Sequence, residues 1–365
     1  MKRRDFLKQS AAGAAISMSS HVARSTRAAA EKWFVVDTHN QHIPREAVQK
    51  SRGGITDLTD IENPRIAPFR RILDLEGKLR AMDDAGVDMA LLHNASTNYL
   101  GLEFCKAMND GNARVMREYP KRFICCAHIP LDDGGSPAAL QEVDRAITGL
   151  GLRAVALETS TDKTVLGSDE LTPLFDKINR LNVPVVIHPA TKLVPGSGLK
   201  HTMHGSINVE IENTKACVEV MFGILPKFPE LKFIMPHHGG ALPIWQGRMM
   251  NSFVPEGWPV PDNLRSEPKT PRVRKLLGLD KAWTEIFNKL YFDTSGFQGW
   301  MPITISALYT VRPDRFCFGT DQGFEMVAAQ DIKGFIEDIK KLNLPEKDRR
   351  NILGENIRTL FNLSA

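Results

Sequence analysis

The sequence has few cysteines and, after residue 30, no long apolar run. Five cysteines occur in 365 residues, and three of them, Cys125, Cys126 and Cys317, lie in short apolar stretches typical of buried strands. We therefore expect small buried side chains rather than a disulfide framework. None of the apolar runs has the ~20 residues that a membrane-spanning helix needs, which argues against a membrane protein.

The first 30 residues differ in composition from the rest. A basic segment, residues 2–8, precedes a mildly apolar stretch rich in Ala, Gly and Ser at 11–23 and the small residues Ala28–Ala30. This order is typical of an export signal. The run Arg3-Arg4-x-Phe6-Leu7-Lys8 resembles the twin-arginine signal, which exports proteins already folded. We expect residues 1–30 to be removed and residues 31–365 to form one periplasmic domain.

The sequence also lacks a basic patch once this leader is set aside. The whole chain carries a net charge of +4, and the leader holds six Lys and Arg against Asp5. Removing the +5 of the leader from the +4 of the whole chain leaves −1. This balance argues against a nucleic-acid partner. We expect a small-molecule substrate, no membrane contact after removal of the signal, and we allow for a homodimer.

Short apolar runs alternate with longer amphipathic stretches along the remaining chain. Near-continuous runs rich in Val, Ile and Phe are typical of parallel strands buried on both faces. Helical patterns separate them, as at 74–85, 136–147, 169–181, 208–224 and 325–341. Eight βα units predict a (β/α)8 TIM barrel, with a doubly wound sheet as the alternative. The predicted strands are 33–38, 87–92, 122–127, 152–157, 183–187, 231–235, 290–294 and 315–319.

Two segments exceed the loops of a minimal barrel. Residues 43–73 follow the first strand, and residues 252–288, rich in Pro, Trp and charge, precede the seventh. Loops of this length are usually functional. We interpret both as pocket or lid insertions, with simple covering of the barrel surface as the alternative.

Histidines gather at the predicted strand ends. Five of the nine after the leader end strands, and His42 and His238 lie just beyond two of those ends. Because the C-terminal ends of barrel strands meet at one face, we expect these imidazoles to converge. Imidazole and carboxylate ligands suit a divalent ion, zinc first and manganese as the alternative. Asp321 supplies a carboxylate after the eighth strand. The five strand-ending residues are His39, His93, His128, His188 and His237.

The motifs around these residues resemble the amidohydrolase-related family that includes aminocarboxymuconate-semialdehyde decarboxylase. The first match is to the family pattern Asp-x-His-x-His-x-x-Pro, and the others follow in family order up to about residue 361. The five matching segments are Asp37-Thr38-His39 with Pro44, Pro184–Pro189, His237–Pro243 with Arg248, Phe318–Asp321 and Ile352–Asn356.

The resemblance implies a metal-dependent hydrolase type of barrel and specific residue roles. His39, His188 and Asp321 would be metal ligands, and His237 would be the acid or base, with Asp321 assisting in proton transfer. Arg248 would orient the site or bind a substrate carboxylate. His93 and His128 match no family motif, and we expect them to support the ligands or the substrate.

The chain departs from the family pattern at residue 41, where Gln replaces the second histidine. Side chains at i and i+2 share a strand face, so Gln41 should face the ion beside His39 while His42 points away. Three interpretations stay open. Gln41 is a weak or indirect ligand, which we slightly favour; a bulge brings His42 in instead; or the metal is loosely held or lost.

Three functions fit these residues. The first is decarboxylation of an aromatic or muconate-like acid, for which Arg65, Arg70, Arg71 and Arg248 are candidate carboxylate partners. The second is hydrolysis or hydration on the same site, for instance of a lactone, ester or amide, because fold and metal do not fix the reaction. The third is a periplasmic binding protein without catalysis. The Arg residues favour decarboxylation.

Overall fold

The computed structural model describes residues 32–48, 50, 67–190, 204–250 and 283–363. The chain divides into residues 1–33 and a compact unit, residues 34–365, and the fold below is that of the second unit. The expected signal lies outside the described residues, as do most of the two expected insertions. In the part of the chain that is described, no helix has the length and apolar character to cross a membrane.

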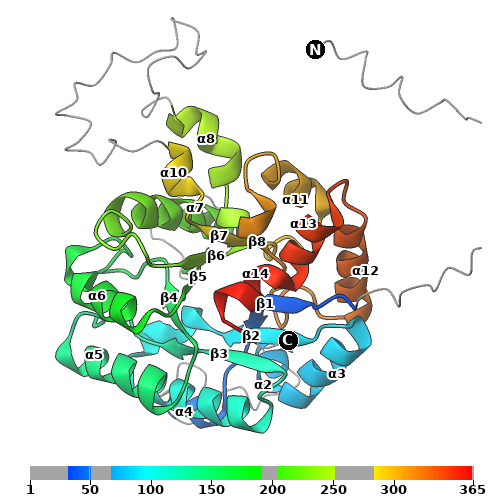
Figure 1. Ribbon diagram of the computed structural model, residues 1–365. Coiled ribbons are helices and arrows are strands. Elements are labelled where there is room, and N and C mark those ends of the chain that lie inside the picture. Colours follow the sequence, from blue (N-terminus) through cyan, green and yellow to red (C-terminus); the bar gives the residue numbers. More distant parts are fainter. Residues whose placement is uncertain (1–31, 49, 51–66, 191–203, 251–282, 364–365) are drawn as a thin grey trace, which may run out of the picture. The chain divides into compact units, whose positions relative to one another are not determined.

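Eight parallel strands form one sheet, in which each strand pairs with the next along the chain (Figure 1). The order β1 to β8 without a reversal is that of a (β/α)8 barrel, as the sequence predicts, and excludes a doubly wound sheet. Each strand lies within a few residues of its predicted position. The strands are β1 Val36–Gln41, β2 Met89–His93, β3 Phe123–His128, β4 Ala154–Glu158, β5 Val185–His188, β6 Phe233–Met235, β7 Tyr291–Asp293 and β8 Phe316–Cys317.

Backbone hydrogen bonds join the first strand to the chain just after the last one. The Thr38 amide donates to the Phe318 carbonyl (2.8 Å), and the Gln41 amide donates to the Gln322 carbonyl (3.1 Å). Asn40 and Gln322 form a parallel bridge between these bonds. The sheet therefore closes on itself, and Asp321 lies at the closing seam beside β1.

The two ends of the barrel interior differ in the kind of side chain that is buried there. A cluster of buried apolar residues includes Val36, Met89 and Ile124, which lie at or next to the first residue of their strands, and also Ile357 of the last helix. At the opposite ends of the strands the buried side chains are polar, such as His93 and His188. Apolar burial thus stabilises one end of the barrel, and the chemistry gathers at the other.

Helices surround this sheet. In α3, the Asp74 side chain accepts from the Gly77 amide (2.8 Å) at the start, and Gly86 ends the helix with φ 81°, a conformation that glycine adopts without strain. The described α-helices are α1 Arg45–Val48, α2 Ala67–Leu73, α3 Leu75–Ala85, α4 Leu102–Glu118, α5 Pro137–Asp144, α6 Thr172–Leu181, α7 His204–Glu219, α8 Leu242–Met250, α10 Trp283–Phe287, α11 Met301–Ala307, α12 Ala329–Lys340, α13 Glu346–Arg350 and α14 Asn356–Leu360.

The structure changes the start of one predicted helix and confirms the expectation for cysteine. The predicted helix 325–341 begins only at residue 329, because Asp321 (φ 53°) and Gly323 (φ 116°) turn the chain into a loop first. The expectation for cysteine is confirmed, since all five are buried and unpaired.

Candidate metal centre and active site

Three predicted ligands meet at the polar end of the barrel. His39 comes from β1, His188 ends β5, and Asp321 follows β8. One potential ligand atom from each lies within 4.8 Å of the other two, and all three residues are buried. His39 Nε2 lies 3.6 Å from Asp321 Oδ1. These distances are compatible with ligation of a single ion.

Hydrogen bonds set the tautomers of both histidines. His39 Nδ1 lies 3.0 Å from the Asp293 carboxylate, and His188 Nδ1 lies 2.8 Å from the Pro189 carbonyl. A carbonyl only accepts, so His188 donates from Nδ1, and its Nε2 lone pair faces the cluster. The carboxylate of Asp293 favours the same arrangement in His39, which is how proteins commonly orient metal-binding imidazoles.

The charges around His39 oppose the effect of its burial. Burial lowers the pKa of a histidine, but the carboxylates of Asp293 and Asp321 outweigh it and raise the pKa of His39. Burial likewise raises the pKa of Asp293, yet the charge and hydrogen bond of His39 bring it down to about 2. For His188 burial acts together with the neighbouring histidines, and its pKa lies well below the usual value.

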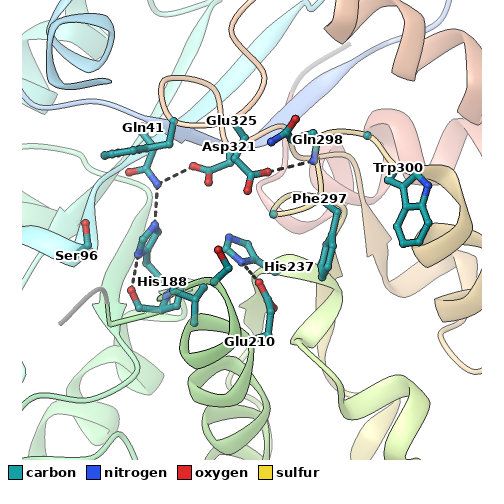
Figure 2. Close-up of a pocket in the computed structure, with 16 residues that line it drawn as sticks. Gln41, Ser96, His188, Glu210, His237, Phe297, Gln298, Trp300, Asp321 and Glu325 are labelled. Atoms are coloured by element: carbon teal, nitrogen blue, oxygen red, sulfur yellow. Dashed lines mark hydrogen bonds and ion pairs between the residues drawn. The ribbon is translucent and has the colours of Figure 1, made fainter. Parts of the chain in front are cut away.

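Gln41 takes the position beside the three ligands. Its amide nitrogen lies 2.7 Å from His188 Nε2 and 3.0 Å from Asp321 Oδ1 (Figure 2). The same nitrogen lies 3.3 Å from His39 Nε2. Its oxygen is buried without a hydrogen-bond partner among the described residues. Separations near 3 Å are those of neighbouring ligand atoms around one ion with bonds of ~2.1 Å. Two imidazoles, a carboxylate and a carboxamide therefore form a donor set that fits a divalent cation.

His42 points away from the ligand cluster, although the pairing of β1 with β2 contains an irregularity of the kind that could have brought it in. The pairing of β1 with β2 shifts between Asp37 and Asn40. His42 Nδ1 nevertheless lies 2.9 Å from the Ile72 carbonyl. Burial, and then the charge of Lys78, lower the pKa of His42 to about 3. The structure thus places Gln41, and not His42, in the ligand cluster.

His237 lies at the same cavity with one ring nitrogen held. Its Nδ1 is 2.8 Å from Glu210 Oε1, while Nε2 has no hydrogen-bond partner in the described part of the chain. Burial lowers the pKa of His237, but the Glu210 charge and hydrogen bond outweigh it and raise the pKa to about 9. Its backbone amide donates to Asp293 Oδ1 (3.0 Å), so Asp293 orients both His39 and His237.

The other predicted histidines surround the cluster without joining it. The His93 ring lies 4.6 Å from that of His39, centroid to centroid. Burial, followed by the nearby histidines, lowers its pKa well below the usual value, so His93 packs as a neutral ring. His128 Nε2 accepts from the Asn94 amide (2.9 Å) and holds the loop after β2; burial lowers its pKa to about 4.

The structure does not bring the three predicted arginines that it describes into the cavity. Arg248 is exposed on α8, and Arg71 donates to the Gly323 carbonyl (3.0 Å) outside it. Arg70 is half-buried on α2 and also does not line it. Arg65 lies outside the described residues. The expected arginine contact to a substrate carboxylate therefore has no counterpart among the described lining residues.

The cavity has a volume of about 880 Å³. Its buried inner part is lined by Gln41, His188 and Asp321 of the ligand cluster and by His237. The loops after β7 and β8, with the exposed Trp300 and Phe324, line its outer part. A cavity of this size suits a small organic molecule. The lining residues that are described are Gln41, Ser96, His188, Pro189, Ser206, Val209, Glu210, His237, Gly296, Phe297, Gln298, Gly299, Trp300, Asp321, Phe324 and Glu325.

Sequence reasoning missed two carboxylates that position the histidines. Asp293 ends β7, so its place at a strand end was a visible signal of the same kind as that of the histidines. Glu210 lies inside α7, and nothing in its local sequence separates it from a surface acid. Its partner, His237, is 27 residues away.

Residues 36–363 match the model of the amidohydrolase family, Amidohydro_2. The chain belongs to this family. The chain is 28% identical over 153 residues, 42% of each chain, to a 2-amino-3-carboxymuconate-6-semialdehyde decarboxylase from Dictyostelium discoideum. It is 24% identical to a gamma-resorcylate decarboxylase from Polaromonas sp. (strain JS666), over 80% of this chain and 89% of the relative.

Solved structures share the fold of this chain. The crystal structure of 5-carboxyvanillate decarboxylase from Novosphingobium aromaticivorans DSM 12444, complexed with manganese and 4-hydroxy-3-methoxy-5-nitrobenzoic acid, has a TM-score of 0.70. It is 20% identical and covers 91% of this chain and 96% of that one. The likeness extends over nearly the whole barrel.

Proposed function

We propose that this member of the amidohydrolase family is a divalent-metal-dependent decarboxylase of an aromatic carboxylic acid. The observation that carries the proposal is the meeting of three potential ligands, His39, His188 and Asp321, at a cavity that also contains His237. Aromatic side chains on the outer wall, Phe297 and Trp300 among them, suit a flat ring. The relatives named as decarboxylases of carboxylated aromatic acids point the same way.

His39, His188 and Asp321 would hold the ion, with Gln41 as a fourth ligand. A half-turn of the Gln41 carboxamide would direct its oxygen to the position where the nitrogen now lies. When bound, the ion would supply a positive charge for the substrate carboxylate and an adjacent oxygen. Zinc and manganese both accept the imidazoles and the carboxylate, but a neutral amide oxygen is a hard ligand and favours manganese over the zinc expected from histidines alone.

His237 would supply the proton that replaces carbon dioxide. Its Nδ1 is held by Glu210, and a pKa of about 9 keeps the ring protonated at neutral pH. The bond between ring carbon and carboxylate breaks, and its electron pair takes the proton from Nε2. His237 then regains a proton from water, so the net reaction consumes one proton and releases carbon dioxide and the arene. A protonated imidazole suits this role better than that of a base.

The experiment combines metal analysis with product analysis. Purified protein with quantified manganese and zinc is incubated with carboxylated aromatics and with lactones, and carbon dioxide is measured. We expect carbon dioxide without net addition of water, and a loss of about 10²-fold or more in kcat for His237→Ala, at unchanged metal content.

Other outcomes favour the alternatives. Ring opening of a lactone without carbon dioxide would identify a hydrolase. Binding of aromatic acids without turnover, in wild type and His237→Ala alike, would identify a binding protein. Full activity of protein without bound metal would reject the metal-dependent mechanism.

We further propose that the protein is exported in the folded state. The twin arginines Arg3-Arg4, the apolar stretch and the small residues Ala28–Ala30 support residues 1–30 as a twin-arginine signal for the periplasm. The choice between zinc, which the sequence predicts first, and manganese, which Gln41 favours, stays a prediction, as does a homodimeric assembly.

A further inference from the structure

The outer part of the cavity carries an acidic group that the proposed reaction does not use. Phe297, Trp300 and Phe324 provide apolar walls there, and Glu325 is the ionisable residue among them. Of the described residues that line the cavity, none is Lys or Arg. A substrate that reaches this end therefore meets an acceptor of hydrogen bonds and no positive side chain within the described lining.

Two loops fix the position of Glu325. Its backbone amide donates to the Asp321 carbonyl (3.0 Å), and its Oε2 accepts from the Gln298 backbone amide (3.2 Å) of the loop after β7 (Figure 2). Gln298 (φ 49°) and Gly323 (φ 116°) give both loops defined turns. Burial and then the charge of Asp321 raise the pKa of Glu325, but a carboxyl group can accept hydrogen bonds in either protonation state. The bond to Gln298 therefore leaves Glu325 able to accept from a ligand.

We propose that Glu325 is a specificity-determining residue, which accepts a hydrogen bond from a ring hydroxyl or amino group of the aromatic acid. The inference rests on the proposed function, because it assumes that the substrate's acid group lies at the ligand cluster. A second carboxylate on the ring at this end would meet a hydrogen-bond acceptor and no positive side chain among the described lining residues, and is disfavoured. Glu325 would therefore select among aromatic acids by the substituent that faces it.

The test uses ligands that bind without reacting. A nitro group is planar like a carboxylate but cannot leave as carbon dioxide. The three positional isomers of nitrophenol and of nitroaniline are compared with the matching nitroanisoles at neutral pH, since an acidic buffer would favour protonation of Glu325, whose pKa is raised. The nitroanilines serve as the donors that stay uncharged under these conditions. Dissociation constants are measured by calorimetry on manganese-loaded full-length wild type, Glu325→Leu and the near-isosteric Glu325→Gln. Glu337→Leu, at a half-buried glutamate on α12 that bonds to Lys340, is the control.

We expect at least one hydroxy or amino isomer to lose about tenfold or more in affinity in Glu325→Leu, as for the loss of one partly buried hydrogen bond. Its anisole should bind wild type and variant equally, and Glu325→Gln should lose less for the hydroxyl. Equal losses for donor and anisole, no loss for either, or a wild type that does not distinguish them would each overturn the proposal. Because no turnover is needed, failure of decarboxylation in the carbon dioxide assay is a separate result.

Discussion

At the scale of single residues, the Glu210 carboxylate controls the protonation of His237. It lies 2.8 Å from Nδ1 and is the main group that raises the pKa of His237 to about 9 against the effect of burial. Glu210→Gln removes that charge and keeps the shape. The pKa of His237 should then fall, since burial continues to disfavour the charged ring.

This change has a defined effect on the pH profile. If His237 donates the proton, kcat/KM in the wild type falls as pH rises through about 9. In Glu210→Gln the fall should begin about one pH unit lower or more, which a profile of kcat/KM measures. Glu212→Gln on the same helix, whose side chain bonds to Ser160 and Lys215, should leave the profile unchanged. Activity that rises with pH in the same range would instead assign His237 as a base.

The same strand-end signal led to different surroundings for different histidines. His39 and His188 meet Asp321 as predicted, whereas His128 bonds to the loop after β2. All three end or continue buried strands, and their distinct partners come from other parts of the chain. Position in a strand was therefore readable from the sequence, but hydrogen-bond partners such as Asp293, 254 residues from His39, were not.

At the scale of elements, the loop after β7 approaches His237 so closely that only glycine fits at position 296. A Cβ on Gly296 would lie 2.3 Å from His237 Cγ, and φ there is 86°. Gly296→Ala should therefore displace the ring and strain the backbone. We expect about tenfold or more loss of kcat, and a loss of about 1–3 kcal/mol in the free energy of unfolding.

Gly334→Ala is the matched control for this change. Gly334 lies inside α12, and an added Cβ would meet nothing within 4 Å. This variant should keep full activity and gain about 0.4–1 kcal/mol in denaturant unfolding. An active, stable Gly296→Ala would show that the ring position is not restricted by this loop.

Periodicity predicted the elements better than their boundaries. The strands were found because both of their faces are buried, which makes them continuous apolar runs. The start of α12 was misplaced by four residues, since a helical pattern at 325–328 is overridden by the turn that holds Asp321 and Glu325. These residues serve the cavity, and local preference yields there to the site.

At the scale of the whole molecule, the fold joins the two ends of the domain. β1 hydrogen-bonds to the chain after β8, and the ligand cluster combines residues from β1, β5 and that same segment. Neither the barrel nor the metal centre can close before the last strand is made. All five cysteines are buried and unpaired, so the fold needs no oxidising compartment.

A chain of this kind suits a route that transports folded proteins, and the twin arginines of the leader allow a direct test. In a bacterium with twin-arginine export, the full-length wild type should appear in the periplasm with a new N-terminus near residue 31. Arg3→Lys/Arg4→Lys keeps the charge of the wild type but removes the arginine pair. It should therefore leave the uncleaved, folded enzyme in the cytoplasm. Arg24→Lys/Arg27→Lys, in the same leader but outside the pair, should be exported normally. Cell fractionation with N-terminal sequencing gives the readout, and unchanged export of the Arg3/Arg4 variant would contradict the assignment while leaving the barrel and its chemistry untouched.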